Sequence, residues 1–200
     1  FSFYATKNMT SGEGGALTCI SEEIYESLKK ARLHGMSKNA ADRYTKKYEH
    51  YDMEFLGYKS NMTNIQAALL IHQLDRIEAY RNKKERISHM YDEGLKNNKK
   101  VSVPSVLPNT KHARHIYTIW VDVKKRDIIL HKLQEKGIGV AVNFRPIHLM
   151  SYYRKKYRYK PGDFPNAEKI GGLTITIPLY PKLTNREAKY IIDVINSTIS

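Results

Sequence analysis

The chain begins with Phe1-Ser-Phe-Tyr-Ala-Thr-Lys7-Asn-Met-Thr-Ser-Gly-Glu-Gly-Gly15, a short segment that leads through one lysine into a glycine-rich turn. Phe1 and Phe3 alternate with Ser2, as the two faces of an extended segment require. The glycines that follow permit the positive φ angles of a tight turn. The sequence therefore predicts that Lys7 lies on a loop that follows a strand.

Lys7 has more than one interpretation. A neutral lysine amine can attack a carbonyl carbon and form a Schiff base. A lone lysine is more often a solvated surface residue, and the spacing does not separate these two interpretations. A phosphate-binding loop fits less well, because Gly12-Glu-Gly-Gly-Ala-Leu-Thr18 lacks the Gly-Lys-Ser/Thr ending that reaches nucleotide phosphates and magnesium.

Three further segments follow the first one along the chain. They are Gly57-Tyr-Lys-Ser-Asn61-Met-Thr-Asn-Ile-Gln-Ala-Ala68, Asn143-Phe-Arg-Pro-Ile-His148 and Ile177-Pro-Leu-Tyr-Pro181. In order and spacing, the four segments resemble the C-terminal half of the DegT/StrS-type nucleotide-sugar aminotransferases, which use pyridoxal phosphate. The resemblance covers essentially all 200 residues.

The resemblance implies an α/β fold, a partial fold-type-I pyridoxal-phosphate transferase similar to aspartate aminotransferase. Residues 1–95 would be the C-terminal part of the cofactor-binding large domain with its connecting helix, and residues 96–200 a small C-terminal α/β domain. Family members run to roughly twice this length, as two domains require. Their N-terminal half carries most of the cofactor pocket. We therefore expect this chain to be the C-terminal part of an aminotransferase.

The resemblance also assigns roles to five residues. Lys7 matches the lysine that binds pyridoxal phosphate covalently and then moves a proton between the substrate carbon and the cofactor. Ser2 matches a hydroxyl that donates to the cofactor phosphate, and Asn61 an asparagine that reaches this phosphate from the neighbouring subunit. Arg145 and His148 match a segment on the sugar-nucleotide side of the site. A surface ion pair for Arg145 and a turn for His148 remain alternatives.

These roles imply transfer of an amino group, from glutamate, to a nucleotide-linked keto sugar in polysaccharide or lipopolysaccharide biosynthesis. A histidine in place of Lys7 would instead resemble the sugar dehydratases of the family. The segment Gly57-Tyr-Lys-Ser-Asn61 resembles enzymes that aminate C4 of a UDP-linked 4-keto sugar. The role of Asn61 implies a homodimer with a shared active site. An inactive fragment that only dimerises is the alternative.

The chain is strongly basic, with 34 Lys and Arg against 20 Asp and Glu and a net charge of +14. This charge raises nucleic acid as a partner, and basic residues cluster at 81–86 and, with interleaved tyrosines, at 154–160. The first cluster lies on the polar side of a predicted helix, as a solvated face would. No known nucleic-acid-binding motif accompanies the clusters, so this partner is a weak alternative. An anionic nucleotide sugar would also benefit from the charge.

We expect a cytoplasmic protein that neither binds nor spans a membrane. The sequence has no apolar run of about 18 residues and no leader-like N-terminus. Its one cysteine, Cys19, cannot form an internal disulfide and is predicted to be buried in a strand. No metal site is expected, because His112 and His115 lack further ligands at a suitable spacing.

Periodicity and capping signals predict the remaining elements. Ser21 begins the first helix, and the pairs Thr63/Gln66 and Thr184/Glu187 form capping boxes. The predicted helices span 22–33, 63–95, 127–136 and 184–199, the predicted strands span 15–20, 115–123, 140–144 and 173–178, and residues 36–60 form an irregular loop. The last three strands would form a small sheet in the C-terminal domain.

Overall fold

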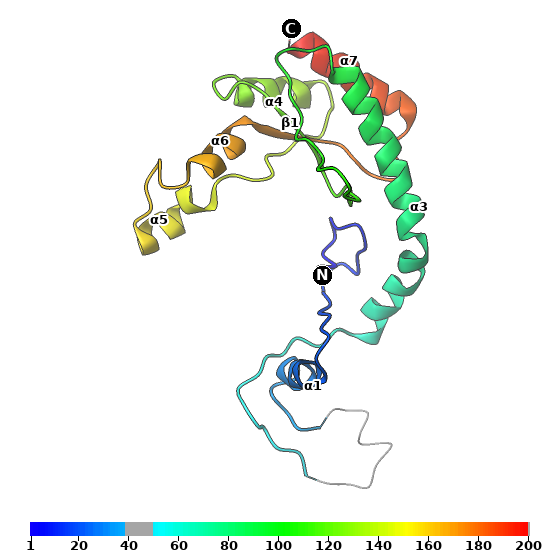
Figure 1. Ribbon diagram of the computed structural model, residues 1–200, viewed down its shortest axis with the longest axis vertical. Helices are drawn as coiled ribbons and strands as arrows, with labels where there is room; N and C mark the ends of the chain where they lie inside the picture. The colour runs from blue at the N-terminus through cyan, green and yellow to red at the C-terminus, as the bar shows by residue number, and fades with distance from the viewer. Residues whose placement is uncertain (39–49, 200) are drawn as a thin grey trace. The chain divides into compact units, whose positions relative to one another are not determined.

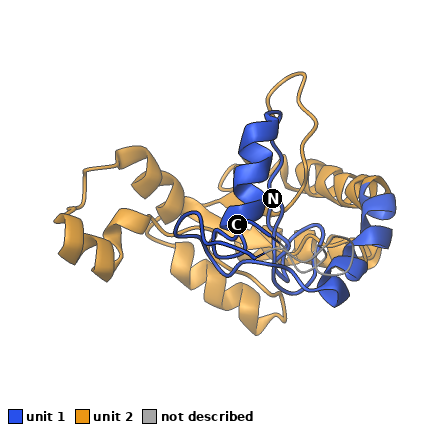
Figure 2. Cartoon of the chain, turned by 90° about the horizontal axis from the view of Figure 1, so that it is seen from below, with its two compact units in different colours: residues 1–77 blue, residues 78–200 orange. Residues whose placement is uncertain are grey.

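The computed structural model describes residues 1–38 and 50–199. The chain divides into two compact units, residues 1–77 (unit 1) and 78–200 (unit 2), which Figure 2 colours separately. The division falls inside the long helix α3, Asn64–Leu95, whose second half belongs to unit 2. This helix lies within one residue of its predicted span, because the apolar stripe and the capping signal are both local.

Unit 1 contains the N-terminal loop, helix α1 (Glu22–Ala31) and the first half of α3 (Figure 1). The Oγ of Ser21 accepts a hydrogen bond from the backbone N–H of Ile24 at 3.3 Å, so the predicted N-cap is confirmed. The predicted strand at 15–20 is absent, since only Gly15 forms an isolated bridge, to Ser2. Cys19 is exposed, so the prediction of a buried thiol in that strand is wrong. No hydrophobic side chain in the described part of unit 1 is buried.

Unit 2 contains a two-stranded antiparallel sheet with helices packed around it. Strand β1 (Tyr117–Trp120) pairs with β2 (Thr174–Ile177), with Tyr117 opposite Ile177 and Trp120 opposite Thr174. Helix α7 (Asn185–Thr198) runs beside the second half of α3 (Figure 1), where Asn196 donates to the Gly94 carbonyl at 3.0 Å. Helix α4 (Arg126–Glu135) packs against α7 and β2. The core comprises Ile87, Tyr91, Leu95, Ile119, Leu133, Ile175, Ile177, Ala188 and Ile195 with their neighbours.

The third predicted strand, 140–144, is reduced to one bridge between Ala141 and Thr176. Glycine weakens strand pairing, and Gly137 and Gly139 precede this segment. Pro146 follows shortly after and lacks the N–H that a ladder needs. The predicted three-stranded sheet is therefore observed as two strands, with isolated bridges from Ala141 to β2 and from Ser102 to β1.

The basic, tyrosine-rich stretch after Ala141 forms elements that the sequence did not predict. They are a short 3-10 helix, η1 (Ile147–Leu149), and the helices α5 (Ser151–Tyr157) and α6 (Pro165–Leu173). Pro165 occupies the first turn of α6, where its missing N–H costs no helical hydrogen bond. In Figure 1, α5 and α6 extend away from the sheet within unit 2.

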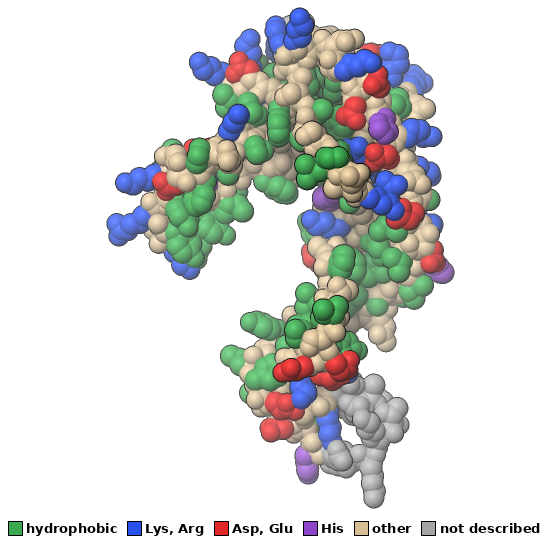
Figure 3. Space-filling model, in the orientation of Figure 1, with side chains coloured by type: hydrophobic (Ala, Val, Ile, Leu, Met, Phe, Trp, Pro, Cys, Tyr) green, Lys and Arg blue, Asp and Glu red, His purple; other side chains and the backbone are tan. Residues whose placement is uncertain are grey.

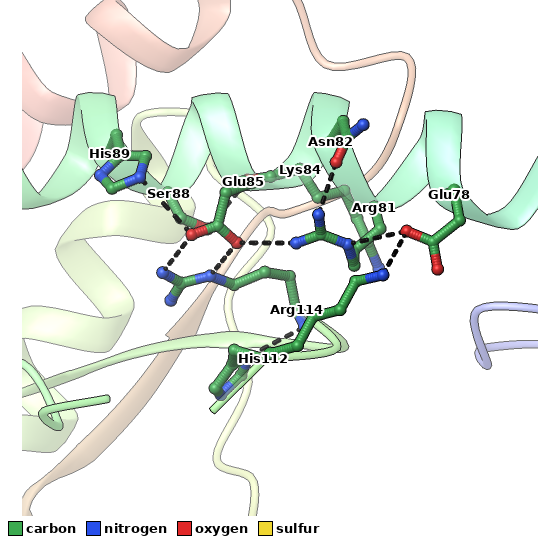
Figure 4. Close-up of polar contacts among 10 residues, drawn as sticks. Glu78, Arg81, Asn82, Lys84, Glu85, Ser88, His89, His112 and Arg114 are labelled. Atoms are coloured by element: carbon green, nitrogen blue, oxygen red, sulfur yellow. Dashed lines mark hydrogen bonds and ion pairs between the residues drawn. The ribbon is translucent and has the colours of Figure 1, made fainter. Parts of the chain in front are cut away.

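A network of ion pairs fastens residues 111–114 to α3 (Figure 4). The Nε and Nη2 atoms of Arg114 donate to the two carboxylate oxygens of Glu85 at 2.8 and 2.9 Å. Lys111 pairs with Glu78 at 2.7 Å, and Arg81 lies between the two carboxylates, 3.3 Å from Glu78 and 3.7 Å from Glu85. The basic cluster at 81–86 is thus a solvated face only in part: Lys83 and Arg86 are exposed, whereas Arg81 joins the ion pairs between α3 and this segment.

Lys84 is the residue of this cluster that departs most clearly from the predicted solvated face. The residue is only 5% exposed. Burial disfavours the charged ammonium and lowers the pKa of Lys84. The sequence did not show this, because a lysine on a basic helix turn is usually solvated.

In the part of the chain that the structure describes, no helix combines the length and apolar character needed to cross a bilayer.

Candidate active site

Lys7 lies within a compact loop at the start of unit 1, between residues that are bridged to one another. Two isolated bridges close this loop, Ser2 with Gly15 and Tyr4 with Gly12. The backbone N–H of Phe3 donates to the Gly14 carbonyl at 2.8 Å, and the N–H of Lys7 itself donates to the Tyr4 carbonyl at 2.9 Å. The Lys7 side chain is exposed. The predicted loop is confirmed, although the segment before it forms bridges rather than a full strand.

The glycines of this loop are required by close contacts. Gly14 has a φ of +129°, and a Cβ there would lie 2.4 Å from the Cε of Met62 and 3.3 Å from the Oγ of Ser11. At Gly15 a Cβ would lie 2.7 Å from the Phe1 carbonyl oxygen. A side chain at either position would therefore push the loop away from itself or from Met62.

Gln73 fastens the Lys7 loop to α3. Its Oε1 accepts from the backbone N–H of Thr10 at 3.0 Å, and its Nε2 donates to the Thr10 carbonyl at 2.8 Å and to the Leu69 carbonyl at 2.7 Å. One side chain thus satisfies both backbone groups of Thr10, three residues after Lys7. The sequence analysis missed Gln73, since nothing in the pattern of α3 distinguishes it from other polar residues on that helix.

Ser2 belongs to the loop that carries Lys7, whereas Asn61 belongs to the segment before α3. Ser2 is exposed and its Oγ accepts from the N–H of Tyr4 at 3.4 Å, which leaves the hydroxyl able to donate to another group. Asn61 is exposed and directly precedes Met62, which contacts Gly14. The predicted capping box follows, since Gln66 N–H donates to the Thr63 Oγ1 at 3.2 Å and Thr63 N–H donates to the Gln66 Oε1 at 3.3 Å. The structure therefore brings the Asn61 segment against the loop that carries Lys7.

Arg145 and His148, the two residues expected on the substrate side, belong to unit 2 and face opposite environments. Arg145 is exposed, whereas His148 is buried, with 6% of its surface accessible. The Nε2 of His148 lies 2.9 Å from the Oε1 of Glu168, which also accepts the N–H of Gly162 at 2.8 Å. These hydrogen bonds, with that of His148 the largest cause, lower the pKa of Glu168. His148 therefore holds the turn before α6 in place, in line with the second of its two interpretations.

The model of the DegT/DnrJ/EryC1/StrS aminotransferase family matches residues 1–196. This chain belongs to that family. The resemblance drawn from the four sequence segments is thus confirmed, and the match extends through both units and nearly to the end of α7.

Two curated relatives match nearly the whole of this chain. MJ1066 of Methanocaldococcus jannaschii is 42% identical over 202 residues, which cover 98% of this chain and 52% of the relative. The spore coat polysaccharide biosynthesis protein SpsC of Bacillus subtilis is 37% identical over 205 residues, which cover 100% of this chain and 53% of the relative. The chain spans about half the length of the curated relatives it matches.

Solved structures give the same result for the fold. Spr1654 from Streptococcus pneumoniae, solved in PMP and PLP forms, matches in its PMP form with a TM-score of 0.87 at 31% identity, covering 99% of this chain and 52% of that one. PseC of Helicobacter pylori, an aminotransferase involved in the biosynthesis of pseudoaminic acid, matches with a TM-score of 0.88 at 26% identity, covering 98% and 52%. The prediction of a partial fold-type-I transferase is confirmed.

The groups around the Lys7 loop suit pyridoxal phosphate. An exposed amine on a rigid loop can reach a carbonyl carbon, and an exposed hydroxyl and amide, those of Ser2 and Asn61, are donors of the kind that phosphate oxygens accept. The glycines at 14 and 15 keep side chains out of this small loop. The residues present therefore fit the cofactor that the family uses.

Proposed function

We propose that this chain is the C-terminal portion of a pyridoxal-phosphate-dependent aminotransferase that moves an amino group from glutamate to a nucleotide-linked keto sugar, such as a UDP-linked 4-keto sugar. Residues 1–95 would complete its large domain and residues 96–200 would form its small domain. The observation that carries the proposal is Lys7, an exposed residue within a loop whose shape requires glycine at positions 14 and 15. Family membership and the polysaccharide pathway named for SpsC support it.

Lys7, Ser2 and Arg145 would each have a separate role in the reaction. Pyridoxal phosphate, when bound, supplies the electron-accepting ring that stabilises negative charge on the substrate carbon. Lys7 would hold the cofactor through its Nζ and, once the substrate amine has replaced it, would move a proton between the substrate carbon and the cofactor. Ser2 donates its hydroxyl to the phosphate. Arg145 pairs with an anionic group of the nucleotide sugar.

The proposal includes a homodimer in which each copy lends Asn61 to the phosphate of the other. Asn61 is exposed on the segment that lies against the Lys7 loop, and exposure is what a donor to a second copy requires. A shared site of this kind uses the two-fold symmetry that most homodimers have.

Covalent labelling of Lys7 tests the proposal directly. The chain is incubated with pyridoxal phosphate, reduced with borohydride, and digested for peptide mass mapping. We expect modification to concentrate on Lys7, because it matches the lysine that binds the cofactor covalently in the family. Lys189, on the exposed face of α7 with 72% of its side chain accessible, reports the background for a surface lysine.

The Lys7→Ala variant is the matched control, and it should lose the labelled peptide without a change in circular dichroism. Equal labelling of Lys7 and Lys189 would contradict the proposal for this chain. That result would favour the alternative, a fragment that dimerises without catalysis. It would be followed by sedimentation to determine whether two copies associate.

A further inference from the structure

Thr10 connects the two sides of the loop that carries Lys7. Its Oγ1 donates to the Phe3 carbonyl at 3.1 Å and accepts the backbone N–H of Gly12 at 3.0 Å. The N–H of Ser11 donates to the same Phe3 carbonyl at 3.0 Å. One hydroxyl thus joins a residue before Lys7 to a residue after it. The path of the backbone at Lys7 therefore depends on where Thr10 is held.

Gln73 on α3 holds Thr10 by both of its backbone groups. The Gln73 Oε1 accepts from the Thr10 N–H at 3.0 Å, and its Nε2 donates to the Thr10 carbonyl at 2.8 Å. An N–H can only donate and a carbonyl can only accept, so this pairing requires a side chain that offers one acceptor and one donor. The Nε2 also donates to the Leu69 carbonyl at 2.7 Å, one turn earlier on α3. This third bond orients the amide toward Thr10, so less conformational entropy is lost when the loop binds to α3.

Unit 1 depends on such bonds because apolar burial contributes little to it. Its described part buries no hydrophobic side chain, and Figure 3 shows hydrophobic side chains of unit 1, in the lower part of the view, at the surface. Thr10 is half-buried, and the neighbouring Ser11 is buried and donates its Oγ to the Glu13 carbonyl at 2.7 Å. Hydrogen bonds are stronger where water is excluded. The contact with Gln73 therefore lies in the part of the loop that is best shielded from water.

We propose that Gln73 is the positioning residue for Lys7, an inference that rests on the proposed function. Gln73 acts through Thr10 and not on the reacting atoms. The Lys7 Nζ forms a C=N bond to the aldehyde carbon of pyridoxal phosphate, and the aldehyde oxygen leaves as water with the two amine protons. An amine on a fixed backbone loses less freedom in this step than one on a loop that moves, so the order that Gln73 imposes makes Lys7 react faster.

The rate at which pyridoxal phosphate and borohydride label Lys7 in the complete 200-residue chain tests the proposal. Gln73→Leu keeps the size of the side chain and removes both bonds to Thr10. It should slow labelling of Lys7 about ten-fold, as loss of two hydrogen bonds would, and leave labelling of Lys189 unchanged. Gln73→Glu keeps the acceptor for the Thr10 N–H but places an oxygen against the Thr10 carbonyl, so it should slow labelling at least as much. A side chain that only filled space would tolerate this change.

Hydrogen exchange, followed by mass spectrometry, separates positioning from unfolding. In Gln73→Leu the amides of residues 1–16 should exchange faster, while those of α1 and of unit 2 should exchange as in the unaltered chain. Loss of protection in α1 as well would mean that Gln73 stabilises unit 1 as a whole, and it would overturn the positioning role. Gln134→Leu is the matched control, because Gln134 is exposed on α4 and its loss should change neither measurement.

The two measurements distinguish this inference from the proposed function. Selective labelling of Lys7 at the same rate in the unaltered chain and in Gln73→Leu overturns this inference alone. Unselective labelling of the unaltered chain removes the aminotransferase proposal for this chain, and hydrogen exchange then decides on Gln73 by itself. Unchanged protection of residues 1–16 in Gln73→Leu overturns the inference, and a loss confined to those residues supports it.

Discussion

Replacing Arg114 with methionine should destabilise unit 2 by about 2 kcal/mol, because it leaves a carboxylate without its main partner. The Arg114 side chain is 10% exposed and forms two hydrogen bonds with Glu85, at 2.8 and 2.9 Å. Removing one member of a fully buried pair costs about 3–5 kcal/mol. Glu85 is 27% exposed and keeps Arg81 at 3.7 Å and His89 at 3.5 Å, so the loss should fall below that range.

The destabilisation should depend on pH in a defined direction. Hydrogen bonds from Arg114 are the largest cause that lowers the pKa of Glu85 in the folded chain. A lowered carboxyl pKa stabilises the fold at every pH above the ordinary glutamate value of about 4.3. This contribution disappears as the pH falls through the folded pKa, because both states then bind the proton. The difference between the unaltered chain and Arg114→Met should therefore be constant near neutrality and shrink in acid.

Urea unfolding followed by the fluorescence of Trp120 measures this difference. Trp120 is the single tryptophan of the chain and ends β1, so its emission reports on unit 2. Glu85→Gln and the double variant complete a thermodynamic cycle that isolates the pair. Lys189→Met removes a partner from the exposed Lys189–Asp193 pair and should change stability by less than about 0.5 kcal/mol. A coupling energy below about 0.5 kcal/mol, or one that persists unchanged in acid, would refute the reasoning.

Three further changes in unit 2 can be followed with the same fluorescence assay. Tyr91→Phe should cost about 1 kcal/mol, because the hydroxyl that donates to the Pro178 carbonyl at 2.8 Å is lost inside the core; an unchanged midpoint would contradict this. Thr184→Ala should also cost about 1 kcal/mol by removing the N-cap of α7, with Thr184→Ser as the control that restores it. Gly94→Ala should destabilise despite the better helix propensity of alanine, since the new Cβ would lie 2.6 Å from the Cγ2 of Ile192; a gain in stability would show that this contact relaxes.

The sequence predicted the elements whose signals are local. Both capping boxes and the apolar stripes placed α3 and α7 within about two residues of their observed ends. It did not predict α5, whose basic and aromatic residues show no clear apolar stripe. It did not predict α6, whose Glu168 is paired with the distant His148. The strand predicted at 140–144 is longer than the observed bridge. Its apolar residues suggested strand pairing, but the glycines before it and the proline after it prevent a full ladder.

In the candidate site, too, the sequence shows short motifs but not the contacts between residues that are far apart in the chain. Lys7, Ser2 and Asn61 were proposed as site residues because each lies in a short sequence motif that resembles the family. Gln73 was not, because its two hydrogen bonds to Thr10 join positions 63 residues apart. The exclusion of side chains at Gly14 likewise depends on Met62, and only the folded chain brings these two residues together.

Unit 1 and unit 2 are stabilised by different forces, and this difference bears on Lys7. Unit 2 has a continuous apolar core, whereas the described part of unit 1 buries no hydrophobic side chain and exposes Leu17, Ile20 and Ile24. The Lys7 loop is therefore ordered by hydrogen bonds, each of which contributes only about 1 kcal/mol net in water. Hydrogen bonds become stronger when water is excluded. Exclusion of water also favours the attack of an amine on a carbonyl carbon. A protein surface that covers these apolar residues would thus supply the hydrophobic stabilisation that the described part of unit 1 lacks by itself.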